Sequence, residues 1–200
     1  MATVRPFSDD LQEWLESDAQ HTLGDLAEIF EEKSFAILFV LLLGLSALPL
    51  PTGGATHVFD VIAVIAAAQL VVGRDKFWIP RRWRGLSVGG GRQQRFVNAL
   101  LKLLRFLERF SRPRLSFLFD HRLTNSIFGL AVIVFTCGAF LAPPFSGLDT
   151  LPALGVVLLS IGVLLEDFAI VVVAVVVGVS GIVLEIVLGK AALAGLKTLF

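Results

Sequence analysis

The chain has 200 residues, 56% of them hydrophobic, and its mean hydropathy is +0.81. Soluble globular domains hold about 45–50% apolar residues, so composition excludes an ordinary water-soluble domain. The formal net charge of zero hides an asymmetry: residues 1–33 carry nine carboxylates, whereas residues 74–122 carry thirteen of the seventeen lysines and arginines. Cys137 is the only cysteine, which excludes a disulfide within the chain, and we expect it to be a small buried apolar side chain.

Residues 1–33 are predicted to form amphipathic helices. Ser8 precedes two aspartates and suits an N-cap, because acidic side chains near a helix start are favoured by the helix dipole. Trp14 suits the membrane interface, so we expect this segment to lie on the membrane surface or to pack on the rest of the protein. A cleavable signal peptide is not expected, because the first apolar run begins only at Phe35, behind this acidic segment.

Residues 34–73 are predicted to form a first membrane hairpin from two apolar runs, 35–50 and 58–73. The residues that break the helix between them are Pro49, Pro51, Gly53 and Gly54. Each run of about 16 residues gives roughly 24 Å of helix, less than the ~30 Å hydrocarbon core. Two arrangements fit: short spans joined by a tight turn at the far interface, or a re-entrant hairpin whose tip stops at membrane depth.

Residues 74–125 form a basic segment that contains a predicted amphipathic helix over 92–112. Tryptophans interleaved with arginines suit the lipid headgroup layer, and a nucleic-acid role does not fit beside such hydrophobic neighbours. By the positive-inside rule, we expect this segment to be cytoplasmic. The residues expected to contact lipid headgroups are Trp78, Arg81, Arg82, Trp83, Arg84, Arg95, Lys102, Arg105, Arg109 and Arg112.

Residues 126–165 are predicted to form a second membrane hairpin that repeats the first. An offset of 93 lays Phe35 on Phe128, and the second helix break consists of Pro143, Pro144 and Gly147. Residues 166–200 are predicted to be a C-terminal transmembrane helix and tail. In that helix, Gly178 and Gly181 would let another helix approach closely.

The sequence therefore predicts an all-α integral membrane protein of two pseudo-repeats. Each repeat combines an amphipathic interfacial helix with short, Pro/Gly-broken transmembrane or re-entrant helices, and one extra transmembrane helix follows. We expect the repeats to be inverted, as in many transporters.

Ionisable or strongly polar residues at membrane depth are functional candidates by default. Those in this chain are His57, Asp60, Gln69, Arg74, Glu166, Asp167 and Glu185. If the first tip is re-entrant, Asp60 and His57 are buried and could relay a proton or bind a cation. If the tip reaches the far interface, they are solvated cap residues. We expect Glu185 to snorkel or to pair with Lys190.

The remaining candidates are expected to hold helices together. Gln69 should hydrogen-bond a neighbouring helix, and Arg74 should pair with Glu166 or Asp167 across the repeats. No cluster of side chains has metal-ligand spacing, and no nucleophile elbow is present, so neither an enzyme nor a metal or other cofactor is expected.

Several motifs carry a family resemblance through their order and spacing. They are Thr22-Leu23-Gly24-Asp25-Leu26, Gln69-Leu70-Val71-Val72-Gly73-Arg74 leading to Trp78-Ile79-Pro80, Leu107-Glu108-Arg109 with Arg112-Pro113-Arg114, and Pro143-Pro144-Phe145 running through Leu151-Pro152-Ala153 to Glu166-Asp167. Over roughly residues 20–190 the chain resembles the bacterial exopolysaccharide-synthesis ExoD family. It departs from that family at Phe168, where the family tends to have glycine. The resemblance implies an integral inner-membrane protein connected with exopolysaccharide production, without supplying a reaction.

We therefore expect a non-enzymatic, multi-pass protein of the bacterial inner membrane that acts in exopolysaccharide synthesis or export in a transporter-like way. The alternatives are a small secondary transporter or channel of unrelated substrate, and a scaffold that recruits polysaccharide enzymes through the basic segment. The expected partners are the lipid bilayer with its anionic headgroups, a second copy of the chain in a homodimer, and polysaccharide-biosynthesis proteins.

Overall fold

Helices make up the secondary structure throughout the part of the chain that the computed structural model describes. That part comprises residues 33–44, 46–48, 57–74, 101–109, 122–142 and 146–197, with the single positions 9, 12, 13, 78 and 111. It is all-helical and contains no strand, as predicted. The helices are α3 (Ser34–Leu43), α4 (His57–Val71), α7 (Arg122–Leu141), α8 (Thr150–Leu164) and α9 (Phe168–Lys197), with a further helix over 101–109. Most of the helices predicted over 8–33 lie outside the described residues.

The helices differ from the predicted apolar runs mainly at their ends. α3 ends at Leu43 with Gly44 as its C-cap, well before residue 50, where the predicted apolar run ends. α7 begins at Arg122, before the start of the predicted hairpin at residue 126. α9 continues to Lys197 and so includes most of the predicted tail, which is rich in the good helix formers Ala and Leu.

The predicted helix breaks fall between observed helices. Pro49, Pro51, Gly53 and Gly54 lie between α3 and α4, and Pro143 and Pro144 lie between α7 and α8; all six are outside the described residues. Gly147, in the second break, has a φ of 69°, the left-handed conformation that glycine adopts at little cost.

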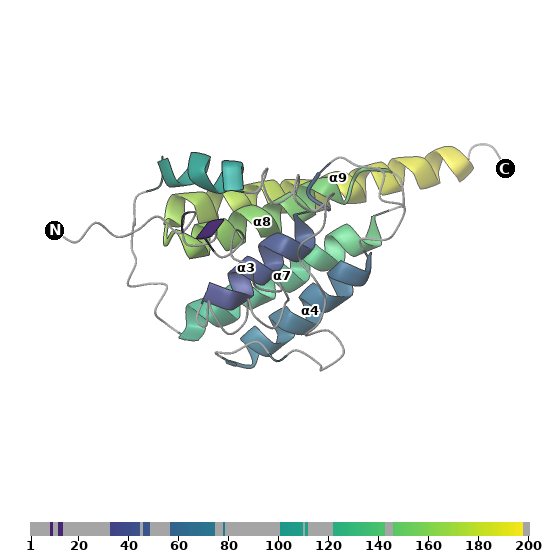
Figure 1. The fold of residues 1–200 in the computed structure, drawn as a ribbon. Coiled ribbons are helices and arrows are strands. Elements are labelled where there is room, and N and C mark those ends of the chain that lie inside the picture. Colours follow the sequence, from purple (N-terminus) through teal and green to yellow (C-terminus); the bar gives the residue numbers. More distant parts are fainter. Residues whose placement is uncertain are drawn as a thin grey trace.

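The five helices pack as two hairpins with α9 laid along one side (Figure 1). α3 packs against α4 and α8, α4 packs against α7, and α8 packs against both α7 and α9. The core therefore sits around α3 and α8, whose side chains are the most completely buried. α4, α7 and α9 form the outside of the bundle.

Contacts near the helix ends fix the helix directions. α4 and α7 are antiparallel, because Ser126 Oγ donates to the Val71 carbonyl at 3.3 Å near one end, and the rings of His57 and Phe140 lie 4.9 Å apart at the other. The same geometry brings the tip of the first hairpin, before α4, to the end of the bundle where α7 turns into α8.

α3 and α8 are also antiparallel. Lys33 Nζ, at the start of α3, donates to the Leu164 carbonyl at the end of α8 at 3.3 Å. α3 and α7 therefore run in the same direction, and both hairpins turn at the same end of the bundle.

Glycines allow α8 and α9 to touch backbone to backbone. A Cβ at Gly155 would lie 2.5 Å from Gly178 Cα, and one at Gly181 would lie 2.6 Å from Pro152 Cδ. The predicted close approach at Gly178 and Gly181 is confirmed, and the approaching helix is α8.

Large apolar side chains cover the outward faces of α4, α7 and α9. They are Val58, Val61, Ile65 and Val72 after or along α4, Leu123, Ile127, Leu130 and Val134 on α7, and Val172, Val176, Val179, Val183 and Ile186 on α9. Cys137 shares the exposed stripe of α7, so the expectation that it would be buried is wrong. Two helical stretches, Leu123–Leu141 and Phe168–Ala191, are long and apolar enough to span a membrane. Only 17% of the α9 window is buried, whereas the core helix of a soluble protein would be mostly buried.

α4 and α8 have the same length and the same C-terminal geometry. Each spans 15 residues, and their bounds differ by the offset of 93. After α4, the Gly73 N–H donates to the Leu70 carbonyl at 2.9 Å, and the Arg74 N–H donates to the Gln69 carbonyl at 3.0 Å. These two hydrogen bonds together form a Schellman cap, in which Gly73 has a φ of 84°.

The end of α8 repeats this cap bond for bond. The Glu166 N–H donates to the Val163 carbonyl at 3.2 Å, and the Asp167 N–H donates to the Gly162 carbonyl at 2.9 Å. Glu166 occupies the left-handed position with a φ of 52°, which is uncommon for a residue other than glycine.

Candidate functional site

The first turn of α4 places a carboxylate inside the bundle. Asp60 is 2% exposed, and its Oδ2 lies 3.3 Å from His57 Nδ1 on the same helix. Its other oxygen, Oδ1, is buried and has no hydrogen-bond partner among the described residues. Burial of an incompletely paired carboxylate opposes folding, so packing alone does not account for this residue. The solvated-cap alternative for Asp60 is therefore wrong in this structure.

The facing stripe of α7 holds a second unpartnered polar atom. Thr136 is fully buried, and its Oγ1 has no hydrogen-bond partner. Two turns earlier on α7, a Cβ at Gly129 would lie 2.9 Å from the Ala67 carbonyl of α4, and one turn later Phe140 also packs on α4. Because helix positions seven apart share a face, Thr136 lies on the α4-facing stripe, at the level of Asp60.

Two further carboxylates reach the same end of the bundle. Glu185 on α9 has a buried, unpartnered Oε1, and its Oε2 would lie 3.7 Å from a Cβ at Gly138 of α7. Asp149 precedes α8, makes no capping hydrogen bond with its side chain, and lies within electrostatic reach of Asp60 and Glu185. Among the described residues no ion pair joins Glu185 to Lys190. We call Asp60, Asp149 and Glu185 the acidic end.

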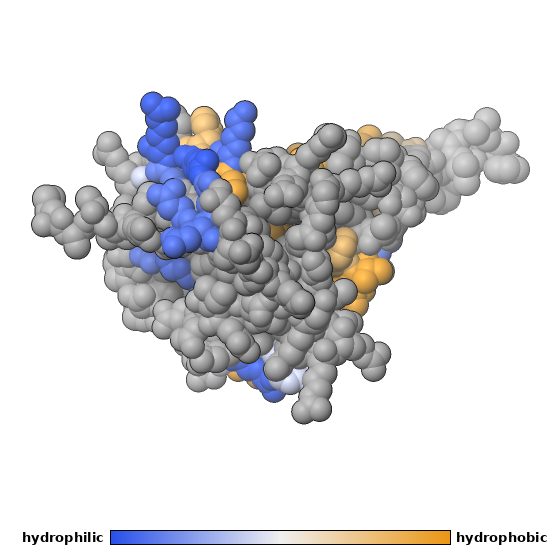
Figure 2. Space-filling view, in the orientation of Figure 1, coloured by the Kyte–Doolittle hydropathy of each residue, from blue (hydrophilic) through white to orange (hydrophobic). Residues whose placement is uncertain are grey.

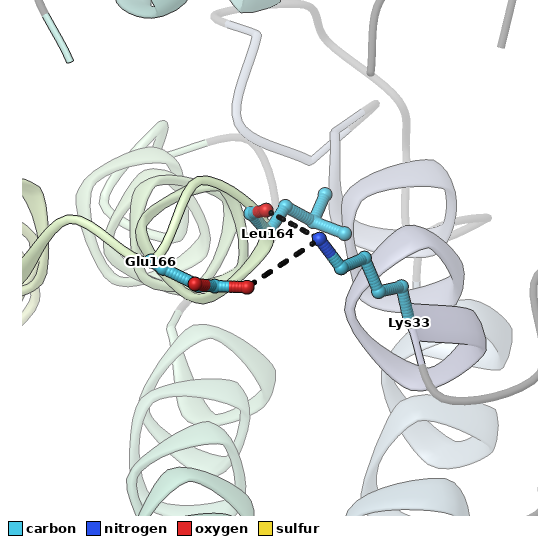
Figure 3. Close-up of polar contacts among 3 residues, drawn as sticks. All are labelled: Lys33, Leu164 and Glu166. Atoms are coloured by element: carbon cyan, nitrogen blue, oxygen red, sulfur yellow. Dashed lines mark hydrogen bonds and ion pairs between the residues drawn. The ribbon is translucent and has the colours of Figure 1, made fainter. Parts of the chain in front are cut away.

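The opposite end of the bundle is held by an ion pair (Figure 3). Lys33 Nζ lies 3.7 Å from Glu166 Oε1 and also donates to the Leu164 carbonyl. This contact ties the start of α3 to the joint between α8 and α9. The partner of Glu166 is thus Lys33 rather than the expected Arg74, which is exposed.

Asp167 and Gln69, also at this end, satisfy backbone groups. Asp167 is buried, and its Oδ1 accepts from the Ala169 N–H at 2.9 Å, which caps α9. Gln69 Oε1 accepts from the Trp78 N–H at 2.9 Å, and its Nε2 donates to the Trp78 carbonyl at 3.3 Å. This two-way bond folds the chain after α4 back onto the helix. It gives a structural reason for the glutamine of the Gln69–Trp78 motif, in place of the expected bond to a neighbouring helix, whereas the tryptophan contributes only its backbone groups.

The basic helix over 101–109 presents its cations outward. Lys102, Arg105 and Arg109 are exposed, whereas Leu101 and Leu104 are buried. Figure 2 shows hydrophilic residues gathered where Figure 1 places this helix. Arg105 also donates to Gln12 Oε1, and Trp78 is 56% exposed. The other residues expected at the headgroups, Arg81, Arg82, Trp83, Arg84, Arg95 and Arg112, lie outside the described residues.

The structure divides the predicted polar residues into two groups. His57, Asp60 and Glu185 come to the acidic end, and Gln69, Arg74, Glu166 and Asp167 lie at the opposite end. Sequence reasoning missed Asp149, although it is the only charged residue between Arg122 and Glu166, and that isolation was an available signal. It also missed Thr136 and Ser46, which no sequence signal marks. Within the described part of the chain, no three His, Cys, Asp or Glu side chains group as metal ligands.

Comparison with known proteins gives the family. Residues 7–187 match the family described as "Exopolysaccharide synthesis, ExoD". The uncharacterized protein slr1875 of Synechocystis is 29% identical over 163 residues, which cover 80% of this chain and 76% of that protein. Protein ExoD of Rhizobium meliloti is 29% identical over 152 residues, which cover 73% of this chain and 61% of that protein. No solved structure matches the chain. Because the family match takes in most of the sequence, from the acidic N-terminal segment through Glu185 of α9, the chain belongs to the ExoD family.

Proposed function

We propose that this chain is a non-enzymatic, multi-pass protein of the bacterial inner membrane that serves exopolysaccharide synthesis in a transporter-like way. The process follows from the family and from the name of the Rhizobium relative. The observation that carries the transporter-like part is Asp60, a buried carboxylate in a mostly apolar helix, with one oxygen that has no hydrogen-bond partner among the described residues. Ionisable residues in such surroundings mark ion or substrate pathways.

The outward apolar stripes of α4, α7 and α9 support the membrane location. Soluble monomers rarely expose contiguous apolar patches this extensive, because water penalises them. In lipid the same stripes need no cover, and helices satisfy their own backbone groups. α4 and α8, at about 22 Å each, are shorter than the ~30 Å hydrocarbon core. We propose that they run beside α7 and α9, which are long enough to span.

A duplicated hairpin is the proposed architecture. The support is the shared offset of 93 in the bounds of α4 and α8 and in their Schellman caps. The contacts between hairpins follow the same offset: Lys33 Nζ donates to the Leu164 carbonyl, and Ser126 Oγ donates to the Val71 carbonyl, each at 3.3 Å. The two donors, Lys33 and Ser126, are 93 positions apart, and so are the two acceptors, Val71 and Leu164. The second contact is therefore the first one with the two hairpins exchanged.

These paired contacts fit a two-fold axis that runs along the helices. Both hairpins turn at the same end of the bundle, so the repeats are proposed to be parallel. The inverted relation expected from the sequence does not fit the contact between Lys33 and Leu164. Parallel repeats are also found in transporters, with binding sites at the repeat interface. The acidic end includes part of that interface, between α4 and α7.

The proposed orientation places the acidic end on the outer side of the membrane. The basic segment that links α4 to α7 emerges at the opposite end, where the positive-inside rule favours the cytoplasm. Five crossings would bring the end of α9 to the outer side as well.

Deletion and complementation in an exopolysaccharide-producing host test the proposal. The wild-type gene should restore polysaccharide yield and fractionate with the inner membrane, whereas Asp60→Asn should reach the same membrane level without restoring yield. Val61→Ala, which changes an exposed neighbour on the same helix, should behave as wild type. Full yield with Asp60→Asn would refute the transporter-like role.

The exposed cations of the 101–109 helix favour one rival, a scaffold that recruits polysaccharide enzymes. That rival requires Lys102→Gln with Arg109→Gln to abolish polysaccharide yield while Asp60→Asn leaves it intact. The transporter-like proposal requires the reverse order of effects. Reporter fusions at residues 147 and 200 complete the test, because both positions should lie outside the cytoplasm.

A further inference from the structure

Asp60 and Thr136, the two buried polar residues between α4 and α7, correspond to two apolar residues between α8 and α3. At the offset of 93, Asp60 corresponds to Ala153 of α8, and Thr136 corresponds to Leu43 of α3; both counterparts are fully buried. α3 and α8 pack on one another as α7 and α4 do. An alanine and a leucine therefore meet the packing needs of this position, and the carboxyl and hydroxyl groups serve something other than the fold.

Unpartnered oxygens gather at this one end of the bundle. The buried side-chain oxygens without a hydrogen-bond partner among the described residues are Ser46 Oγ, Asp60 Oδ1, Thr136 Oγ1 and Glu185 Oε1. Ser46 is 3% exposed and follows α3 at the tip of the first hairpin, where both hairpins turn. Buried polar groups are almost always paired, so these four oxygens make this end of the bundle a suitable place to bind a group that donates hydrogen bonds or carries positive charge.

Among the described residues, no lysine or arginine pairs with Asp60 or Glu185. In the part of the chain that the structure describes, the charged and titratable groups within electrostatic reach of Asp60 are His57 from α4 and Asp149 from the start of α8, and Glu185 of α9 lies within reach of Asp149. The described residues of α3 and α7 add none at this end. Asp60 therefore has one imidazole and one further carboxylate within electrostatic reach, and the repulsion between the two carboxylates favours uptake of a positive ligand.

We propose that the acidic end is a proton-binding site in which Asp60 is the buried acceptor and His57 is its relay to water. This inference rests on the membrane location in the proposed function. His57 is partly exposed, with 30% of its side chain accessible, and its Nδ1 already faces Asp60 Oδ2. When protonated, the imidazole passes a proton from Nδ1 to Oδ2, which leaves a neutral imidazole and a neutral carboxylic acid. Thr136 Oγ1, which lies on α7 at the level of Asp60 and has no hydrogen-bond partner among the described residues, would accept a hydrogen bond from the protonated carboxyl group.

A proton fits this site better than a metal ion. Calcium takes six to eight oxygen ligands and magnesium six, and in protein sites several of these are carboxylates. The acidic end does not bring three such side chains together as metal ligands. A proton needs only one acceptor oxygen and a hydrogen-bonded route to it.

Infrared difference spectroscopy on the full chain in vesicles of phosphatidylethanolamine and phosphatidylglycerol tests the inference. A change from alkaline to acidic medium should produce the carbonyl band of a protonated carboxyl group in apolar surroundings. Asp60→Asn should lose that band, and Thr136→Val should shift it to higher frequency because a hydrogen bond is removed. Asp9→Asn, an exposed acid outside the bundle, should leave the band unchanged.

Two outcomes would overturn the inference. One is a band that survives in Asp60→Asn, provided that circular dichroism shows both variants folded. If Asp60→Asn fails to fold, Thr136→Val serves alone, and an unshifted band overturns the inference. The other is a spectral response to sodium or calcium at constant pH that Asp60→Asn abolishes, which would make the ligand a metal cation. Polysaccharide yield is scored separately, so a lost band with normal yield would leave the proton site standing and sink the proposed function.

Discussion

The two helical hairpins, α3–α4 and α7–α8, differ most in what covers their second helix. α4 exposes Val58 and Ile65, which are 62% and 43% accessible, whereas their counterparts Leu151 and Leu158 on α8 are half-buried. α9 lies along α8, and among the described helices none lies in the corresponding position on α4. The second helix of the first hairpin, α4, thus lies on the outside of the bundle, whereas that of the second hairpin, α8, lies in its core.

The size of one buried residue on each helix follows this difference in packing. Gly155 of α8 touches the backbone of α9, whereas its counterpart on α4 is Ile62, a full-sized buried side chain. The glycine is needed where a fifth helix must come close, and it is absent where no such helix packs. α4 and α8 therefore share their length and C-terminal cap and differ in the side chains that contact neighbouring helices.

Filling the α8–α9 contact should have the largest effect on stability. Gly155→Ala places a Cβ 2.5 Å from Gly178 Cα, and a backbone atom cannot move aside as a flexible side chain can. We expect a loss of about 3 kcal/mol in the free energy of unfolding, measured by thermal or denaturant unfolding in detergent. Gly189→Ala is the matched control, because a Cβ there meets nothing within 4 Å and should instead stabilise α9 by up to about 1 kcal/mol. Equal effects of the two changes would refute the close contact.

Making the first hairpin apolar like the second should separate stability from function. Asp60→Ala removes a buried carboxylate with an unpartnered oxygen, so we expect a gain of about 2 kcal/mol in the free energy of unfolding. Polysaccharide yield in the complemented deletion strain should nevertheless be lost. A less stable Asp60→Ala protein would mean that the carboxyl group supports the fold, contrary to the proposed equivalence with Ala153.

The two Schellman caps allow a smaller test of equivalence. Gly73 and Glu166 occupy matching left-handed positions, with φ of 84° and 52°. Gly73→Ala should cost about 1 kcal/mol, because a Cβ is unfavourable in that conformation. Glu166→Gly relieves the same strain but loses the Lys33 pair, so its net effect on unfolding should be smaller than that of Gly73→Ala. A larger cost for Glu166→Gly would show that the ion pair outweighs the backbone term.

The ion pair between Lys33 and Glu166 should have the smallest effect. Both side chains are substantially exposed, at 46% and 39%, and pairs of this kind contribute about 0.2–1 kcal/mol. Lys33→Met should therefore lower the unfolding temperature only slightly, and added salt should reduce the difference from wild type. Ser126→Ala is the matched change on the other hairpin and should show no salt dependence.

The sequence predicted the elements better than it predicted their faces. The Pro/Gly breaks, the offset of 93 and the C-terminal helix were visible because proline, glycine and long apolar runs have direct backbone consequences. α8 and α9 are apolar on all sides, so periodicity could not separate the core-facing side from the exposed side. Cys137 on α7 was expected to be buried because cysteine is usually a small buried side chain, although it is exposed.

The acidic end could be predicted only in part. Asp60, His57 and Glu185 stood out because charge is rare in apolar runs. Their meeting with Asp149 depends on the antiparallel register of α8 and α9, and the position of Thr136 depends on that of α4 and α7. The register between two helices is set by tertiary packing, so it cannot be predicted from the local pattern of residues within each helix.

The length of α9 has a practical consequence. Its 30 residues make a rod of about 45 Å, and its last turns project past the other helices in Figure 1. A rigid helical fusion partner grafted in phase onto residue 197 would extend this rod clear of a detergent micelle. Such a handle would give a protein of only 21.7 kDa the mass and asymmetric shape that particle alignment in electron cryomicroscopy requires.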